Sequence, residues 1–229
     1  MEEIAKVPVI TIDGPSSSGK GTLCQALAKK LKWNFIDSGA IYRILALKVL
    51  KNKISINKEK TLLSLIKKLN INFFIKNNCI KIFDKNKDIS KDIRNEIVGN
   101  LASKIASLYK IRKNLLKYQR SFRIFPGLIA DGRDMGTVVF RDSKVKIFLD
   151  ASSETRAIRR MKELKKQGLN IKFNYILSQI KKRDYRDRNR KFSPLIPDKN
   201  ALLLDSTFLT IEEVIFKAFN YIKKTFILL

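Results

Sequence analysis

The sequence predicts an α/β fold in which helices cover both faces of a five-stranded parallel sheet. Five short apolar runs alternate along the chain with segments of helical periodicity, and this alternation favours a parallel sheet. The runs occupy residues 7–13, 34–37, 127–131, 144–150 and 201–206. An acidic residue closes each run, at Asp13, Asp37, Asp131, Asp150 and Asp205. Because ligands bind beyond the carboxyl ends of such strands, we expect one or two of these aspartates to be functional and the others to cap turns.

The first apolar run leads into a glycine loop and then into a helix. Gly14 and Gly19 bracket four residues, Lys20 follows, and the next apolar residues have helical spacing. This order is the context of a phosphate-binding loop, in which backbone N–H groups, a helix N-terminus and a lysine meet an anion. The hydroxyl that usually follows the lysine comes one residue later, because Gly21 precedes Thr22. The alternative is a serine-rich turn without a ligand.

The segment between the second and third runs changes character near residue 70. Helix 41–51 is amphipathic, and "INFFI" and "CIKIF" then read as two short strands separated by "KNN". The pair Asn77–Asn78 favours a two-residue hairpin turn. Residues 60–108 are therefore predicted to form an inserted α+β lobe. A long helix follows, with an apolar side formed by Ile111, Leu115, Leu116 and Phe122.

The last third of the chain is predicted to be mainly helical. Ser152 or Ser153 caps a very basic helical segment at about 154–191, and "SPLIP" interrupts it. The final helix starts at a capping box formed by Thr210 and Glu213. Its expected buried stripe is Ile211, Val214, Ile215, Ala218, Phe219 and Ile222.

The composition excludes several classes of function. The 229 residues contain no histidine, which removes histidine bases, Ser–His and Cys–His nucleophiles, and histidine-ligated metals. The sequence contains no run of about 18 apolar residues, so it predicts no membrane span. The acidic start "MEEIAKVP" lacks a signal-peptide core, and Cys24 and Cys79 are far apart without a CxxC motif. We expect both thiols to be reduced in a cytoplasmic protein.

The formal net charge of +27 is the most unusual global property. Such a charge is typical of nucleic-acid-binding proteins. Here, however, the excess is mostly lysine, spread along the chain together with many isoleucines and asparagines, and no aromatic RNA-binding motif accompanies it. A genome biased toward A·T-rich codons explains this surplus, and a balanced composition in the other proteins of that genome would contradict the explanation. We do not expect nucleic-acid binding as the main role.

Arginines gather near the expected strand ends, and they narrow the chemistry. Arg43 follows "DSGAIY", Arg133 lies in "ADGRDMG", and a cluster fills "KKRDYRDRNRK". On one helix, Arg183, Asp187 and Arg190 would share a face, although a solvated charged surface is the alternative. A phosphate acceptor needs no general base, since its second pKa is about 6, and the catalytic task is to align and neutralise two anions. The absent "NKxD" motif disfavours GTPases, and a nucleoside monophosphate kinase fits.

Five motifs together resemble the bacterial cytidylate kinase family. They are "PVITIDGPSSSGKGTLCQ", "DSGAIYR", "GLIADGRDMGTVVF", "VKIFLDASSE" and "IKKRDYRDRNR", and the resemblance runs from about residue 7 to 224. The motif "DGRDMG" separates this family from adenylate kinases and eukaryotic UMP/CMP kinases, which carry "DGFPR" there. The resemblance implies a three-layer P-loop kinase fold. Its core would be 1–59, 109–153 and 192–229, with a monophosphate-binding insert at 60–108 and a short helical lid at 154–191.

The resemblance also implies a role for each matching residue. The ATP phosphates would be held by Gly14, Pro15, Ser16, Ser17, Ser18, Gly19, Lys20, Gly21 and Thr22. The CMP phosphate would be held by Ser38, Arg43 and Arg133, cytosine by Ser103, Arg112 and Asp134, and ribose by Arg183 and Asp187, with Arg190 near the base or the transferred phosphate. Lys20, Arg133, Arg183 and Arg190 would be catalytic.

The implied reaction is transfer of a phosphoryl group from ATP to CMP or dCMP, with Mg²⁺, by a cytoplasmic monomer. Which aspartate binds Mg²⁺ stays open. Two alternatives also stay open at this point: a P-loop kinase that acts on another small molecule, such as UMP or shikimate, and a basic nucleic-acid-binding protein that hydrolyses ATP.

Overall fold

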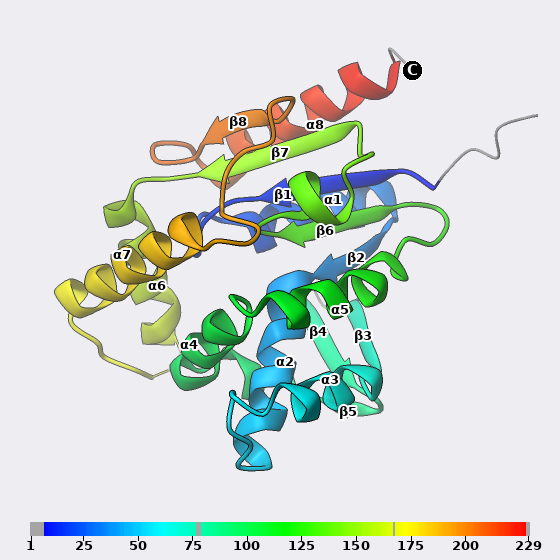
Figure 1. Cartoon of the computed structure of the whole chain (residues 1–229). Coiled ribbons are helices and arrows are strands. Elements are labelled where there is room, and N and C mark those ends of the chain that lie inside the picture. The colour runs from blue at the N-terminus through cyan, green and yellow to red at the C-terminus, as the bar shows by residue number, and fades with distance from the viewer. Residues whose placement is uncertain (1–6, 77–78, 167, 228–229) are drawn as a thin grey trace, which may run out of the picture.

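The central sheet has five parallel strands, as the sequence predicts (Figure 1). The computed structural model describes residues 7–76, 79–166 and 168–227. The strands are β1 (Val9–Asp13), β2 (Asn34–Asp37), β6 (Leu128–Gly132), β7 (Val145–Asp150) and β8 (Leu202–Asp205). Their order in the sheet is β2-β6-β1-β7-β8. Because β1 lies in the middle, the loop that follows it opens at the centre of the carboxyl edge, where the other strands also end.

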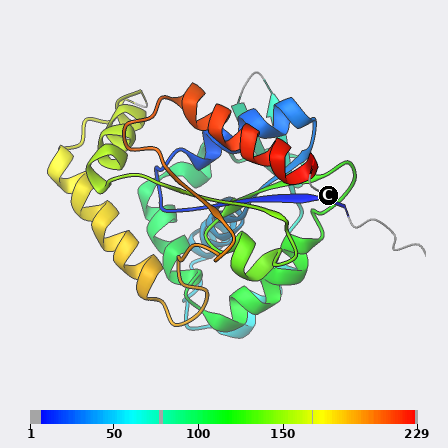
Figure 2. The ribbon, with the colours of Figure 1, turned by 90° about the horizontal axis from the view of Figure 1, so that it is seen from above.

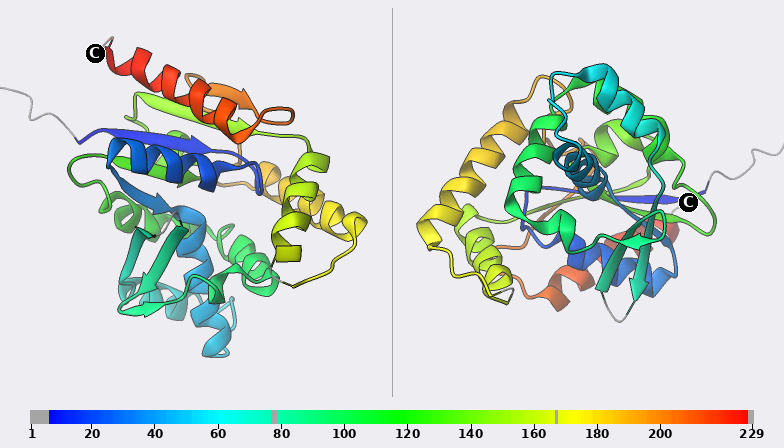
Figure 3. Two further views of the ribbon diagram at one scale, coloured as in Figure 1. Left: turned by 180° about the vertical axis from the view of Figure 1, so that it is seen from behind. Right: turned by 90° about the horizontal axis from the view of Figure 1, so that it is seen from below.

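The strands are mostly apolar because both faces of the sheet are covered, and Thr11 and Lys146 are buried polar exceptions. Ile10 and Ile12 point to the face covered by α1 (Lys20–Leu31) and α8 (Ile211–Ile227), whereas Val9 joins the cluster under α2 (Ser38–Lys51). Figure 3 shows α1 and α8 side by side on one face of the sheet. The edge strand β8 is less covered than the inner strands, since Leu203 is 66% exposed.

The segment between α2 and β6 holds a second, antiparallel sheet. It contains α3 (Glu59–Lys67), β3 (Ile71–Lys76), β4 (Cys79–Asp84), β5 (Lys87–Asp88), η1 (Asp92–Arg94), α4 (Glu96–Ile105) and α5 (Tyr109–Arg120). The β3–β4 hairpin confirms the predicted strand pair, and the short β5 was not predicted. The turn at residues 77–78 and the side chain of Cys79 lie outside the described part of the chain. Leu62, Ile82 and Val98 belong to the same buried cluster as α2, so this segment packs directly on the core.

The basic segment after β7 forms two helices rather than one. They are α6 (Ser153–Lys166) and α7 (Phe173–Asn189), and Figure 2 shows them beside the sheet, away from the C-terminal end of α8. Gly168 has a φ of +80°, the Leu169 N–H donates to Leu164, and the Gly168 N–H donates to Lys165, which is the Schellman pattern that ends a helix. The two helices pack through Ala157, Leu164, Ile176 and Ile180.

The predicted helix caps are confirmed. The Ser152 hydroxyl accepts from the Thr155 N–H at 3.2 Å, while Thr210 and Glu213 exchange the two hydrogen bonds of a capping box. The predicted stripe of α8 is wrong at Ile211, which is 56% exposed because it lies in the first turn, before the helix reaches the sheet. Across the described residues, we find no helix with both the length and the apolar character needed to span a membrane.

Candidate active site

A cavity of about 370 Å³ opens at the carboxyl edge of the sheet. Its wall contains all nine residues expected to bind CMP: Ser38, Arg43, Ser103, Arg112, Arg133, Asp134, Arg183, Asp187 and Arg190. The wall also contains six residues of the predicted phosphate loop, namely Ser16, Ser17, Gly19, Lys20, Gly21 and Thr22. Gly14, Pro15 and Ser18 are not part of the wall. The sequence motifs, although up to 174 positions apart by residue number (190 − 16), therefore meet in one space.

The phosphate loop requires its glycines for two different reasons. A Cβ on Gly14 would lie 2.0 Å from the backbone oxygen of Leu149, so the loop can pass β7 only without a side chain. Gly19 is the N-cap residue of α1 with a φ of +98°, and no side chain caps this helix. The first N–H groups of α1 therefore lack intrahelical acceptors and face the cavity side, where they suit an anion.

Cationic side chains hold the carbonyl groups of this loop. The Lys20 Nζ donates to Pro15 at 2.6 Å, and Arg133 donates to Gly14 at 2.7 Å. Arg156 donates to the Ser16 carbonyl at 3.3 Å, and Arg159 donates to the Ser18 carbonyl at 3.1 Å. Because these four carbonyl groups accept hydrogen bonds from cationic side chains, the N–H groups of the loop are left to interact with a ligand.

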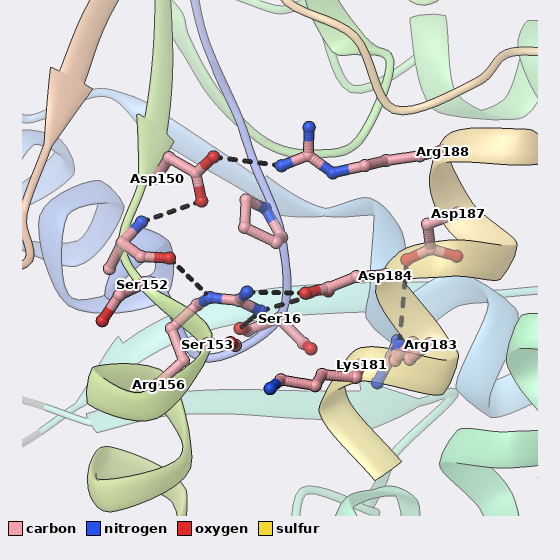
Figure 4. A network of polar contacts seen from close by, with 12 residues as sticks. Ser16, Asp150, Ser152, Ser153, Arg156, Lys181, Arg183, Asp184, Asp187 and Arg188 are labelled. Carbon is pink, nitrogen blue, oxygen red and sulfur yellow. Dashed lines mark hydrogen bonds and ion pairs between the residues drawn. The ribbon is translucent and has the colours of Figure 1, made fainter. Parts of the chain in front are cut away.

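Arg156 also connects the two helices of the basic segment (Figure 4). Its side chain is only 3% exposed and forms a two-pronged ion pair with Asp184 of α7, with N···O distances of 3.1 and 2.5 Å. Its Nε donates to the Ala151 carbonyl at 2.9 Å. We did not predict either residue, because nothing in their spacing separates them from the many other charges of this segment. The pair joins α6, α7 and Ser16 of the phosphate loop into one unit.

The cavity concentrates positive charge. The pKa of Lys20 is lowered to about 8 and that of Arg183 to about 9. Burial is the larger cause in both cases, and repulsion from the neighbouring Arg133 is the second. Burial also lowers the pKa of Arg43 to about 10. Within the described residues, four buried polar atoms of the predicted CMP site have no hydrogen-bond partner: Ser103 Oγ, Arg112 Nε, Arg183 Nε and Arg190 Nη2. Unpaired donors beside crowded cations are suited to an anionic, oxygen-rich ligand.

The buried residues Asp134 and Asp187 form their closest ion pairs with arginines that are distant in sequence. Asp134 pairs with Arg112 rather than with the adjacent Arg133, and both members of the pair are buried. Arg133 instead contacts Asp187 at 3.2 Å, closer than the 3.9 Å between Asp187 and Arg183. Although Asp134 and Arg133 are adjacent in the chain, each forms its ion pair with a different residue. The Arg183–Asp187 pair exists, but it is the longer of the two contacts.

Arg190 corrects a second expectation. It is the C-cap residue of α7 with extended backbone (φ −70°, ψ 139°), so it does not share a helical face with Arg183 and Asp187. It still lines the same cavity, because the extended backbone turns its side chain back toward the site, where its Nε donates to the Ser193 carbonyl. Its pKa is lowered by burial and by the nearby Arg112.

The five strand-end aspartates differ in their hydrogen-bond partners; Asp150 accepts from Ala151 and Arg188, and Asp205 accepts from Thr207. Asp13 accepts from the N–H groups of Met135 and Gly136, both at 2.8 Å, and thereby fixes the short π-helix η2 (Met135–Val139). Asp37 caps α2 by accepting from Ala40. In the part of the chain that the structure describes, Asp131 is hydrogen-bonded to no protein group, and burial raises its pKa to about 7 despite the nearby Lys20.

Replacing Asp131 should change how the free energy of unfolding depends on pH. Folded protein keeps a proton on Asp131 at pH values where the unfolded chain, with a pKa near ~3.9, has lost it. The free energy of unfolding should therefore fall as the pH rises from about 4 through about 7, and Asp131→Asn should flatten this slope. Asp13, whose pKa burial raises to about 6, leaves a residual slope.

Urea unfolding over this pH range provides the measurement. Asp92→Asn, which removes an exposed carboxyl group, is the matched control and should keep the wild-type slope. An Asp131→Asn slope equal to that of the wild type would mean that the carboxyl group is not buried as described.

Sequence reasoning missed the outer wall of the cavity. Arg160, Glu163 and Gln179 line it from α6 and α7, and the Tyr175 hydroxyl donates to Glu96 of α4 at 3.2 Å. This bond links the basic helices to the segment with the antiparallel sheet across the cavity mouth. No motif marks these residues, because their shared position depends on how two distant helices are packed.

Comparison with known families agrees with this geometry. A family model described as "Cytidylate kinase" matches residues 10–224. The chain belongs to the cytidylate kinase family. A curated relative named "Cytidylate kinase" from Photorhabdus laumondii is 54% identical over 221 residues, covering 96% of this chain and 97% of the relative. Another of the same name, from Proteus mirabilis, is 55% identical over 218 residues, covering 95% and 97%.

A solved structure supports the fold alone. It is an uncharacterized protein from Eubacterium ventriosum with a TM-score of 0.52 and 12% sequence identity, and the match covers 96% of this chain and 99% of that chain. The chain is thus an α/β kinase of the cytidylate kinase family, as the five motifs predicted.

Proposed function

We propose that this chain transfers the γ-phosphoryl group of ATP to CMP, and also to dCMP, and so forms CDP or dCDP and ADP. The observation that carries the proposal is a single cavity that begins at a phosphate loop, continues along crowded cations and ends at the buried Arg112–Asp134 pair. This order matches the parts of two nucleotides placed phosphate to phosphate. Family membership supports the same reaction.

The reaction needs positioning and charge compensation more than acid–base chemistry. Lys20 and the N–H groups of the loop hold the ATP phosphates, while Ser38, Arg43 and Arg133 hold the acceptor phosphate. An acceptor phosphate with a second pKa of about 6 is largely ionised at neutral pH and attacks without a base. Arg133, Arg183 and Arg190 offset charge on the moving group, since guanidinium forks match phosphoryl oxygens.

Cytosine is read by a donor–acceptor pattern. Its exocyclic amino group donates, whereas uracil has a carbonyl oxygen at that position. An ionised Asp134 only accepts, so it favours cytosine and repels uracil. Arg112 and Ser103 donate to the ring acceptors that both bases share. The free Ser103 hydroxyl and Arg112 Nε are the donors left for this purpose.

The ribose is bound by Arg183 and Asp187. Burial alone would raise the pKa of Asp187, but Arg133, Arg183 and Arg190 together hold it below its usual value, so the carboxylate accepts from sugar hydroxyl groups. Asp187→Ala should raise the KM for CMP, more than that for dCMP, with an unchanged KM for ATP. Equal effects on all three substrates would leave Asp187 as a structural partner of Arg133.

Mg²⁺ fits beside Asp131. The carboxylate lies 3.8 Å from where a Cβ on Gly21 would be, at the start of α1, and it has no competing protein donor in the described chain. No group of three possible ligand side chains occurs among the residues with described positions, which suits an ion held by one carboxylate, Thr22 and the phosphates. When bound, Mg²⁺ neutralises phosphate charge. Asp131→Asn should therefore need a higher Mg²⁺ concentration for half-maximal activity, and an unchanged requirement contradicts this assignment.

We further propose that residues 60–108 and 154–191 close over the bound nucleotides, while 1–59, 109–153 and 192–229 remain as the core. Closure keeps water from the γ-phosphate. Hydrogen exchange checks this: CMP should protect amides within 60–108, and equal exchange with and without CMP argues against it. A cytoplasmic monomer completes the proposal, and sedimentation together with cell fractionation tests it.

A substrate panel tests the proposed reaction. ADP release should be fast with CMP and dCMP, and much slower with UMP, AMP and shikimate. Faster release with one of the latter would replace the proposed acceptor with that molecule. Salt-dependent binding to DNA or RNA, together with ATP hydrolysis that does not respond to CMP, would instead favour a nucleic-acid-dependent ATPase.

A further inference from the structure

Gln119 on α5 is a buried polar residue that the proposed reaction does not use. Its side chain is 1% exposed, and its Nε2 donates to the Ser38 Oγ at 2.8 Å, across 81 positions of sequence. Ser38 lines the cavity, whereas Gln119 lies behind it and does not. A buried amide destabilises a fold unless it is hydrogen-bonded, so its presence in an otherwise apolar cluster calls for a specific role.

The direction of this hydrogen bond determines what Ser38 can do. A serine hydroxyl has one proton to donate and two lone pairs that accept. The Gln119 amide occupies one lone pair, and among the described residues the hydroxyl proton of Ser38 has no protein acceptor. The proton is therefore directed away from Gln119 and toward the cavity, where a phosphate oxygen can accept it.

The position of Ser38 strengthens this reading. It is the first residue of α2, and the preceding Asp37 already accepts from Ala40 at 2.9 Å. The N–H groups of Ser38 and Gly39 precede that bond and lack intrahelical acceptors. An anion at this helix start would meet two backbone donors and the oriented hydroxyl together.

The helix that carries Gln119 also fixes other parts of the acceptor site. Arg112, seven residues earlier and thus on the same helical face, pairs with Asp134. On the next position, Arg120 donates to the carbonyl groups of Val139 at 2.8 Å and Val138 at 3.3 Å. One face of α5 therefore supports the base end of the site through Arg112 and the phosphate end through Gln119.

We infer that Gln119 is a positioning residue for the acceptor phosphate: it orients the Ser38 hydroxyl so that this group donates to the phosphate of the bound nucleoside monophosphate. The inference rests on the proposed role of Ser38 in binding the CMP phosphate. Gln119 itself touches neither substrate, and its effect is transmitted only through Ser38.

Two substitutions separate orientation from simple packing. Gln119→Met keeps length and volume but cannot donate, so the Ser38 hydroxyl loses its preferred direction. Gln119→Glu turns the donor into an acceptor, which draws the Ser38 proton away from the phosphate and adds a negative charge behind it. The KM for CMP should rise about 3- to 10-fold in the first variant and about 10-fold or more in the second, with a nearly unchanged KM for ATP.

A comparison of CMP with cytidine makes the readout specific for the phosphate. Calorimetry with the full-length protein should show weaker binding of CMP to both variants and unchanged binding of cytidine, which lacks the phosphate. Asn114→Met is the matched control, because its amide lies on the exposed side of α5 and bonds only to Lys110 of the same helix, at 2.8 Å. This control should bind both ligands as the wild type does.

A double-mutant cycle then tests the connection through Ser38. Ser38→Ala should weaken CMP binding, and adding Gln119→Met to it should have no further effect. Additive losses, or equal weakening of CMP and cytidine, would overturn the inference. If Ser38→Ala binds CMP normally, the proposed phosphate role of Ser38 fails as well; if Ser38→Ala is impaired while both Gln119 variants are not, the inference about Gln119 alone fails. Thermal unfolding identifies any variant that is not folded. If Gln119→Met does not fold, Gln119→Glu is used for the test instead.

Discussion

Lys20→Ala should lower the kcat of phosphoryl transfer by about three orders of magnitude or more, while CMP binding stays nearly unchanged. The side chain is 6% exposed, and its Nζ is held by the Pro15 carbonyl at the turn of the phosphate loop. In the proposed function, this ammonium group faces the phosphates of ATP and the charge that develops during transfer, and it has no part in recognising cytosine at the other end of the cavity.

Coupled ADP release gives the kcat, and calorimetry gives the affinity for CMP. Lys30→Ala is a suitable control, because it removes a lysine from the exposed side of the same helix, where its Nζ lies over the ring of Phe219. A Lys20→Ala enzyme that retained a third of wild-type turnover would be incompatible with the assignment. So would a large loss of CMP affinity.

Asp134→Asn should reduce kcat/KM for CMP by about 10³-fold and narrow the preference for CMP over UMP by about 10²-fold or more. The asparagine amide can rotate and donate to the uracil carbonyl, which the carboxylate repels. Its oxygen can still accept from Arg112, so the guanidinium keeps a partner. Asp134→Ala leaves Arg112 buried and unpaired and should destabilise the fold by about 3–5 kcal/mol.

Steady-state kinetics with CMP and UMP measure the first effect, and urea unfolding of both variants separates it from stability. The two variants serve as controls for each other. Asp134→Asn should be nearly as stable as the wild type but altered in specificity, whereas Asp134→Ala should be unstable. If activity on CMP and UMP falls by the same factor in Asp134→Asn, the residue shapes the turn and does not read the base.

The strands and the phosphate loop were predictable because their physics is local. A parallel strand buried on both faces is mostly apolar, and Val9, Ile10 and Ile12 give β1 that character within a single short run. The loop was recognisable because Gly14, Gly19 and Lys20 stand at the right spacing between a strand and a helix, although the clash that excludes a side chain at Gly14 comes from the distant Leu149. The Schellman end of α6 has a local signal as well, in Gly168, although it was not used.

The partners of charged groups could not be predicted in the same way. Among 48 basic and 21 acidic residues, sequence spacing alone placed Arg183, Asp187 and Arg190 on one helical face. The folded chain brings Asp187 to Arg133 across 54 positions and leaves Asp134 to Arg112. The hydrogen bond from Gln119 to Ser38 joins residues that are even further apart in sequence, by 81 positions. The partner of each charged or polar group depends on how the helices pack. A short stretch of sequence carries no information about that packing.

The crowding of Lys20, Arg133 and Arg183 has a thermodynamic consequence for the whole protein. Burying these cations opposes folding, and their mutual repulsion adds to that cost: burial first, and the neighbouring Arg133 second, lower the pKa values of Lys20 and Arg183. A polyanionic ligand bound among them would offset that cost, and any ligand that binds only the folded chain stabilises it increasingly as the ligand concentration rises above the dissociation constant. With nucleotides as that ligand, as the proposed function has it, nucleotide concentration would govern the amount of folded enzyme as well as its rate.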